Sequence, residues 1–202
     1  MPITTCVFDA YGTLFDVAAA ARLAAQEDPQ NAFAQHWPKL AEIWRAKQLQ
    51  YTWLRAITDA HTNFWHVTQD GLDFALESLG IHQNDTLRTR LLKLYWELPA
   101  YPEVPKILKD LKSLGLNTAI LSNGSPDMLN GAVQSAGLEA DLDAVLSVES
   151  TGIFKPDTSV YDLVGKEFYS SKDEVLFVSS NGWDAAAASG YGFCTVWVNR
   201  AE

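Results

Sequence analysis

The sequence predicts an α/β fold in which a Rossmann-like parallel sheet forms the core domain and a helical cap is inserted after the first strand. Short apolar runs recur at residues 5–8, 118–121, 144–148, 175–178 and 194–198, as expected for buried parallel strands. From residue 104 onward these runs alternate with helix-like stretches, which is typical of a parallel sheet with helices on both faces. The long segment between the first two runs has helical spacing and no strand pattern.

The first strand is predicted at residues 5–8 and ends at a single carboxylate. Asp9 directly follows the apolar run and precedes a sharp turn at Gly12 and Thr13. Open α/β sheets bind their ligands at the carboxyl ends of the strands, so Asp9 is a candidate nucleophile. Taken alone, an acid in this position more often caps a turn. The rest of the chain decides between these two interpretations.

Residues 16–98 are predicted to form the cap, and residues 1–15 and 99–202 the core domain. The cap segment is rich in Ala, Leu and Trp, and its apolar residues recur with helical spacing from Leu40 to Ile57. The segment 98–102, which contains Pro99 and Pro102, breaks this pattern and returns the chain to the core.

Four helices are predicted in the core domain, at residues 104–114, 126–136, 158–168 and 183–189. Gly115, Gly137 and Gly190 follow the first, second and fourth of them, at positions where glycine commonly ends a helix. Each of these helices precedes a predicted strand, which supports a sheet built from parallel crossovers.

Length and charge limit the classes of function. The chain has 202 residues, 48% of them hydrophobic, and a formal net charge of -10. This length is sufficient for one domain, or one domain with an insertion, around a sizeable core. The acidic balance disfavours nucleic acid and anionic membrane surfaces as partners, because both are bound mainly by basic patches. An anionic substrate therefore requires a local cation.

The cysteines favour a reducing compartment. Cys6 and Cys194 lie far apart without metal-type spacing and are interpreted as small buried hydrophobic residues, so cytoplasmic localisation is expected. We expect neither secretion nor membrane anchoring, because no leader pattern and no apolar run of about 18 residues is present. No role is assigned to the four histidines, which are His36, His61, His66 and His82.

Polar side chains follow four of the predicted strands. Asp9 follows the first strand, Ser122 and Asn123 follow the second, Lys155 lies beyond a short loop after the third, and residues 179–184 follow the fourth. Because the carboxyl ends of parallel strands meet at one edge, we expect these groups to share one crevice. Considered without the other residues, Lys155 is interpreted as a surface lysine and Asp184 as an acid in the first turn of a helix. Their convergence favours an active site.

Four segments carry a resemblance to a known family: Asp-Ala-Tyr-Gly-Thr at 9–13, Ser-Asn at 122–123, Lys-Pro at 155–156 and Ser-Ser-Asn-Gly-Trp-Asp at 179–184. In this order they resemble the haloacid dehalogenase superfamily and, more narrowly, its L-specific (S)-2-haloacid dehalogenases. The cap segment 44–55 is also similar to that family, so the resemblance spans nearly the whole chain. It implies a hydrolase whose reactants are a small 2-haloalkanoate and water, and it makes a homodimer a candidate assembly.

The resemblance also implies a mechanism. Asp9 attacks C2 of the haloacid, halide leaves with inversion, and water then hydrolyses the aspartyl ester. Thr13 and Ser179 are expected to orient Asp9, and Asp184 to activate or position the water. The other catalytic residues that the resemblance implies are Arg45, Lys155, Tyr161 and Asn181.

Each of these supporting residues has an expected task. Arg45 reaches from the cap to the halide, Lys155 offsets the clustered negative charge, and Tyr161 orients Lys155 or Asp9. The halide site is completed by Asn123 and the edge of Phe64. Ser122 and backbone N–H groups at Ala10, Tyr11 and Asn123 are expected to hold the substrate carboxylate. The apolar side of the pocket is expected to be formed by Tyr11, Leu49, Phe64 and Trp183.

The residues near Asp9 argue against a metal cofactor, and none is expected. Related phosphatases use an Asp-x-Asp motif in which the second acid protonates the leaving oxygen, but here that position holds Tyr11. Magnesium prefers carboxylate oxygens, whereas Ser179, Ser180 and Asn181 precede Asp184. Two alternatives remain open: a magnesium-dependent phosphatase of the same superfamily, and an inactive protein that binds small carboxylates.

Overall fold

The computed structural model describes residues 2–28 and 33–200. Within these residues, five strands form one sheet in the order β3-β2-β1-β4-β5, and every pairing is parallel. The strands are β1 (Thr5–Phe8), β2 (Asn117–Ser122), β3 (Ala144–Ser147), β4 (Val175–Ser179) and β5 (Cys194–Trp197). The predicted α/β fold class is therefore confirmed.

The central position of β1 determines where Asp9 emerges. Thr5 pairs with Asn117 on one side and with Val175 on the other, and all four residues of β1 are buried. The Asp9 N–H donates to the Val178 carbonyl at 2.9 Å, which extends the ladder by one residue. Asp9 is thus delivered to the middle of the carboxyl edge, with the ends of β2 and β4 beside it.

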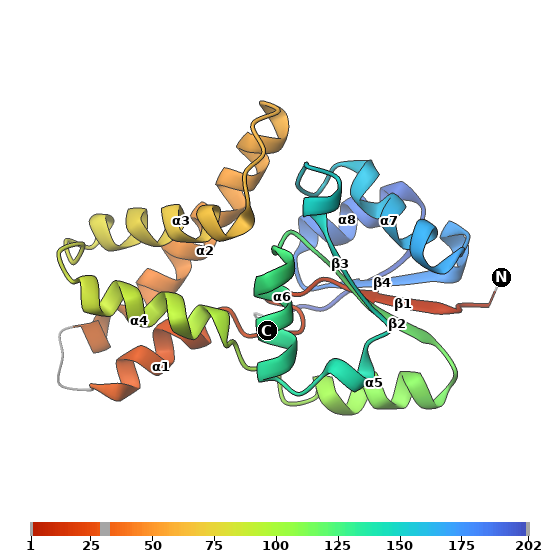
Figure 1. Ribbon diagram of the computed structural model, residues 1–202, viewed down its shortest axis with the longest axis horizontal. Coiled ribbons are helices and arrows are strands. Elements are labelled where there is room, and N and C mark those ends of the chain that lie inside the picture. The colour runs from red at the N-terminus through yellow and green to blue at the C-terminus, as the bar shows by residue number, and fades with distance from the viewer. Residues whose placement is uncertain (1, 29–32, 201–202) are drawn as a thin grey trace.

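Helices cover both faces of the sheet (Figure 1). They are α5 (Val104–Ser113), α6 (Pro126–Ser135), α7 (Thr158–Phe168) and α8 (Gly182–Tyr191). Figure 1 shows α7 and α8 on one side and α5 and α6 on the other, the arrangement expected from right-handed crossovers on both sides of β1. The predicted end of α8 at Gly190 was wrong. The helix continues to Tyr191, because Gly192 is the residue with the left-handed φ of 115°.

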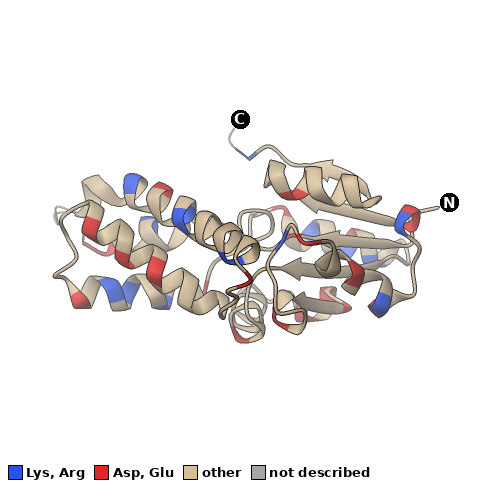
Figure 2. Cartoon of the chain, turned by 90° about the horizontal axis from the view of Figure 1, so that it is seen from above, with Lys and Arg blue, Asp and Glu red and all other residues tan. Residues whose placement is uncertain are grey.

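Among the described residues, four helices lie between β1 and α5 in the chain and stand beside the sheet domain (Figure 1). They are α1 (Ala19–Glu27), α2 (Phe33–Ile57), α3 (Phe64–Ser78) and α4 (Asp85–Trp96). Asn63 and Asn84 accept backbone N–H groups at the starts of α3 and α4, as N-caps do. Figure 2 shows basic and acidic residues interspersed along these helices. They occupy the segment predicted as the cap, and the division into two domains stays a prediction.

Helices α2, α3 and α4 are joined by buried contacts around Trp44. This side chain is 2% exposed, donates its indole N–H to the Thr68 carbonyl at 2.8 Å, and packs on Tyr95 with ring centroids 4.8 Å apart. Gln48, one turn along α2, bonds to the side chains of Thr68 and Tyr95. Trp44 and Gln48 fix the rotation of α2, so that Arg45 faces the sheet domain.

The last strand differs from the prediction of a buried strand. β5 is an edge strand, and its Val196 and Trp197 side chains are exposed, Trp197 by 58%. Cys194 is also exposed, so only Cys6 fits the interpretation as a buried residue. An apolar run predicts a strand but does not tell a central strand from an edge strand. Among the described residues, no helix combines the length and apolarity needed to cross a membrane.

Candidate active site

Asp9 is held by three side chains at the carboxyl edge of the sheet. Its Oδ2 accepts hydrogen bonds from the Thr13 hydroxyl at 2.9 Å and the Asn181 amide at 2.8 Å, and its Oδ1 lies 3.3 Å from Lys155 Nζ. Gly12 makes the turn between Asp9 and Thr13 possible, because its φ of 87° is strained for other residues. The carboxylate is therefore oriented, as a nucleophile must be.

Lys155 joins Asp9 to a second, fully enclosed carboxylate. Its ammonium donates to Asp184 Oδ2 at 2.8 Å and to the Leu121 carbonyl at 2.7 Å. Tyr161 donates to Asp184 Oδ1 at 2.7 Å, and Ser179 donates to Asp184 Oδ2 at 3.2 Å. Asp184 has no exposed surface, so all of its contacts lie within the chain.

These contacts change three expected roles. Ser179 was expected to orient Asp9, but its hydroxyl donates to Asp184 and accepts the Asn181 N–H. Tyr161 was expected to orient Lys155 or Asp9, but its hydroxyl also donates to Asp184. Asp184 was expected to meet the hydrolytic water, yet it is enclosed by three donors. In this arrangement, Asp184 contacts Lys155, and Lys155 lies beside Asp9.

The enclosed cluster has a clear electrostatic character. Burial raises the pKa of Asp184 above its ordinary value, and the nearby Asp9 charge adds to this, whereas Lys155 and the Tyr161 hydrogen bond oppose it. Burial and the Asp184 charge raise the pKa of Tyr161 as well, so this hydroxyl stays a proton donor. The Lys155 ammonium thus lies between the carboxylates of Asp9 and Asp184. A second cation near this group would offset the remaining negative charge.

Arg45 supplies that second cation. Its Nη2 donates to the Tyr11 carbonyl at 2.9 Å and to Asn181 Oδ1 at 3.1 Å. Asn181 therefore links the cap arginine to Asp9, since its amide nitrogen binds Asp9 while its oxygen accepts from Arg45. Arg45 thus reaches the residues around Asp9, and its expected binding of the halide stays a prediction.

Several donors around Asp9 have no acceptor within the described chain. The backbone N–H groups of Ala10 and Tyr11 donate to none of these residues, and neither does the Ser122 hydroxyl, which accepts the Gly124 N–H at 3.1 Å. The side-chain oxygen Oδ1 of Asn123 accepts the backbone N–H of Lys155 at 2.9 Å. The side-chain amide N–H groups of Asn123 therefore remain available. Together these donors make the surroundings of Asp9 suited to an anion.

An aromatic wall closes one side of the site. The Tyr11 ring lies 5.8 Å from Phe64 and 5.7 Å from Tyr95 between centroids, and Phe64 is 2% exposed. A side chain at Gly124 would meet Tyr11 Cε2 at 2.7 Å, so the ring lies directly on that glycine. The Tyr11 hydroxyl is buried without a partner among the described residues, and burial raises its pKa well above the ordinary range.

Two predicted lining residues lie further out. Leu49 follows Arg45 by one turn of α2 and is half-buried. Trp183 packs edge-on against Trp53 across the boundary between α8 and α2, with centroids 5.5 Å apart. The structure thus brings Asp9, Thr13, Lys155, Asn181 and Arg45 into direct contact, whereas Leu49 and Trp183 belong to the outer side of the site.

Sequence reasoning missed two groups of supporting residues. Ser180 donates to the Gly12 carbonyl at 2.7 Å, and its N–H donates to Thr13 Oγ1 at 2.9 Å, which ties the two loops together. His61, to which no role was assigned, pairs with Glu149 at 3.1 Å across the cap and the core. Ser180 lies inside the recognised 179–184 motif and could have been found there, whereas no motif marks Glu149.

The donor set does not fit a divalent cation. In residues 2–28 and 33–200, no group of three or more His, Cys, Asp or Glu side chains is arranged to hold a metal ion. The Lys155 ammonium lies 3.3 Å from Asp9 and 2.8 Å from Asp184, where it would repel such a cation. Oxygen-rich carboxylate ligation, which Mg²⁺ prefers, is not offered at Asp9.

The sheet, the helical segment beside it and the Asp9 site define a protein of the haloacid dehalogenase class. A family model described as a haloacid dehalogenase-like hydrolase matches residues 3–192. The chain is 44% identical over 199 residues to (S)-2-haloacid dehalogenase 1 of Pseudomonas sp. (strain CBS-3), covering 98% of this chain and 86% of that protein. The chain belongs to the (S)-2-haloacid dehalogenase family.

Solved structures agree with this membership. The L-2-haloacid dehalogenase from Xanthobacter autotrophicus with chloropropionic acid covalently bound superposes with a TM-score of 0.88 at 39% identity, covering 99% of this chain and 79% of that one. A crystal structure described as a dehalogenase with an intermediate complex superposes with a TM-score of 0.93 at 38% identity, covering 99% and 86% of the two chains. The expected family is confirmed.

Proposed function

We propose that this chain hydrolyses (S)-2-haloacids to (R)-2-hydroxyacids and halide. The observation that carries the proposal is the orientation of Asp9, whose Oδ2 accepts from Thr13 and Asn181 while Lys155 lies beside Oδ1. The covalently bound chloropropionic acid of the Xanthobacter relative supports an enzyme-bound intermediate. The substrate class follows from family membership, and the nucleophile follows from the geometry.

In the first step, an Asp9 oxygen attacks C2 from the side opposite the halogen. A C–O bond forms as the C–halogen bond breaks, the bonding pair leaves with the halide, and the configuration at C2 is inverted. Halide is a weak base that needs no proton to depart, so the absence of an acid at Tyr11 is no obstacle. Arg45 and the free amide N–H groups of Asn123 would bind the departing halide, since both supply donors beside Asp9 and its neighbours.

The substrate carboxylate requires its own donors. The Ser122 hydroxyl and the N–H groups of Ala10 and Tyr11 donate to no acceptor in the described chain, so they remain available to it. Binding the carboxylate there would hold C2 in front of Asp9 and the halogen toward Arg45. This fixed orientation explains a preference for one enantiomer.

In the second step, water attacks the carbonyl carbon of the Asp9 ester. The bond between this carbonyl carbon and the ester oxygen breaks, and that oxygen takes up one proton and leaves as the hydroxyl of the 2-hydroxyacid. The water oxygen stays in the restored Asp9 carboxylate, and the second proton passes to solvent. Lys155 stabilises the negative charge that develops on the carbonyl oxygen as water adds, because its ammonium lies 3.3 Å from Asp9 Oδ1. Asp184, Tyr161 and Ser179 keep Lys155 in this position.

The test is halide release from (S)- and (R)-2-chloropropionate in the presence of EDTA, with wild type and Asp9→Asn. Release from the (S) substrate by wild type alone supports the proposal. Loss of activity in EDTA would instead indicate a metal-dependent hydrolase, and binding without halide release would indicate a carboxylate-binding protein. Cytoplasmic localisation and a homodimer stay predictions.

A further inference from the structure

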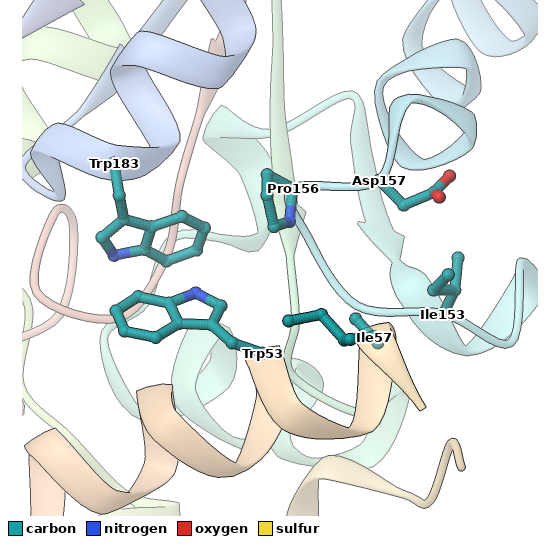
Figure 3. Close-up of a pocket in the computed structure, with 7 residues that line it drawn as sticks. Trp53, Ile57, Ile153, Pro156, Asp157 and Trp183 are labelled. Carbon is teal, nitrogen blue, oxygen red and sulfur yellow. The ribbon is translucent and has the colours of Figure 1, made fainter. Parts of the chain in front are cut away.

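An apolar groove lies beside the active site, between the end of α2 and the core domain. Its volume is about 450 Å³. Trp53 and Ile57 of α2 form one wall, and Ile153, Pro156, Asp157 and Trp183 form the other (Figure 3). Figure 3 shows the Trp183 and Trp53 rings next to each other, with Ile57 and Pro156 extending the apolar surface beyond them.

The groove continues the Asp9 site along one ridge of α2. Arg45, Leu49, Trp53 and Ile57 follow one another at intervals of four residues, so each lies about 6 Å further along the helix. The first of them is bonded to Asn181 in the site, and the last two line the groove.

The core side of the groove also begins at the site. Pro156 directly follows Lys155, and Trp183 lies two residues after Asn181. Lys155 and Asn181 both contact Asp9. Each wall of the groove is therefore attached to a residue that contacts Asp9 or Asn181.

The chemistry of the groove favours an uncharged chain. Its surface is formed mainly by indole, isoleucine and proline groups, and the single carboxylate is Asp157. Asp157 Oδ1 accepts from the Ser159 N–H and hydroxyl, so this side chain also caps α7. An apolar substituent would be removed from water in the groove, whereas a second carboxylate would be repelled by Asp157.

We propose that this groove is the subsite for the C2 substituent of longer-chain or aryl-substituted 2-haloacids, and that Trp53 and Ile57 determine the accepted chain length. The proposal rests on the proposed dehalogenase function. The carboxylate and C2 stay at Asp9, and the substituent passes Leu49 and Trp183 toward Ile57. The enzyme then accepts monocarboxylates with long apolar chains and discriminates against dicarboxylates.

The test compares kcat/KM for (S)-2-chloropropionate and (S)-2-bromooctanoate in wild type and Ile57→Asp. Ile57 is 82% exposed, so the variant is expected to fold. We expect the variant to lose about tenfold in the octanoate-to-propionate ratio, because a charge replaces the apolar surface that covers the chain end. The matched control is Leu54→Asp, since Leu54 lies on the same helix, is 51% exposed and does not line the groove.

A second variant tests the effect of the Asp157 carboxylate in the groove. Asp157→Asn keeps an oxygen that caps α7 but removes the carboxylate. We expect its preference for (S)-2-bromooctanoate over (S)-2-bromooctanedioate to fall by about threefold, the scale of a partly exposed charge pair.

The outcomes separate the two proposals. Equal octanoate-to-propionate ratios in wild type, Ile57→Asp and Leu54→Asp, or no turnover of the long acid by wild type, would overturn the subsite while halide release from chloropropionate upholds the function. No halide release from any of the acids would overturn both.

Discussion

Asp184 Oδ2 accepts a hydrogen bond from Lys155 Nζ at 2.8 Å, and both side chains are cut off from solvent. The same ammonium lies 3.3 Å from Asp9, so the position of the nucleophile depends on a carboxylate that itself has no access to substrate. A buried carboxylate beside one ammonium is costly unless its other lone pairs are also bonded, and Tyr161 and Ser179 provide those bonds.

We predict that Asp184→Asn lowers kcat for halide release by about 100-fold, because displacement of Lys155 by a fraction of an ångström disturbs Asp9. Single-turnover measurements with (S)-2-chloropropionate check the rate, and circular dichroism checks the fold. The matched control is Asp162→Asn, an exposed acid on α7 that bonds to Tyr191. A rate within twofold of wild type in Asp184→Asn would contradict the role of Asp184.

The raised pKa of Asp184 predicts the pH dependence of stability. Folding raises this pKa above its unfolded value of about 4, so the folded state binds more protons than the unfolded state between those two values. The contribution of Asp184 to the free energy of unfolding therefore falls as pH rises from about 4 through the folded-state pKa. Urea unfolding of wild type and Asp184→Asn across this range measures it: the difference, wild type minus variant, should decrease. An increasing difference would show that Lys155 outweighs burial.

The close approach of Tyr11 to Gly124 gives a third prediction. In Gly124→Ala, the new methyl group would lie 2.7 Å from Tyr11 Cε2 and 3.0 Å from a Leu129 methyl group. We expect a loss of about 1–3 kcal/mol in stability and a lower kcat/KM, because the Tyr11 ring must leave its place beside Phe64. Thermal unfolding and halide release check both effects.

Gly190→Ala is the control for that substitution. Gly190 lies within α8 at a negative φ, and apart from its chain neighbours and the adjacent helix backbone no described atom lies within 4 Å of the added carbon. Alanine is favoured over glycine in a helix interior by roughly 0.5–1 kcal/mol, so this variant should be slightly more stable than wild type. Equal effects of the two substitutions would contradict the packing argument.

The sequence predicts the centre of the site because residues that directly follow the strands of a parallel sheet lie at one edge. Asp9, Asn123, Lys155 and Asn181 come after successive strands, and a parallel sheet brings such positions to one edge. The position of a residue after a strand does not predict which hydrogen-bond partner its side chain has. Whether Ser179 meets Asp9 or Asp184 depends on the direction of a single side chain at the end of β4.

Contacts between distant segments without a motif were not predictable. Glu149 and His61 lie 88 residues apart, and Gln48 and Tyr95 lie 47 residues apart. No sequence motif marks any of these four side chains. Their partners are determined only by how the distant segments pack together. The outer groove was missed for the same reason, since Trp53 and Trp183 meet only when the two parts are assembled.

Glu149 supports the last prediction, because it joins the core to the first turn of α3. Its Oε1 accepts the Phe64 N–H at 3.2 Å, and its Oε2 pairs with His61 Nε2 at 3.1 Å. Phe64 in turn lies 5.8 Å from the Tyr11 ring and 6.3 Å from Phe154 between centroids. Glu149 is therefore expected to position Phe64 in the aromatic wall of the site.

In Glu149→Ala both bonds are lost, and we expect kcat/KM for (S)-2-chloropropionate to fall by about tenfold as Phe64 moves. Glu149→Gln keeps an oxygen that can accept the Phe64 N–H, so it should recover most of that loss. Glu77→Ala, an exposed acid near the end of α3, is the control and should match wild type. Because a simple loss of stability would lower the active fraction without changing KM, both parameters are measured separately. Equal loss in the alanine and glutamine variants would show that charge on Glu149, rather than its bond to Phe64, is what matters.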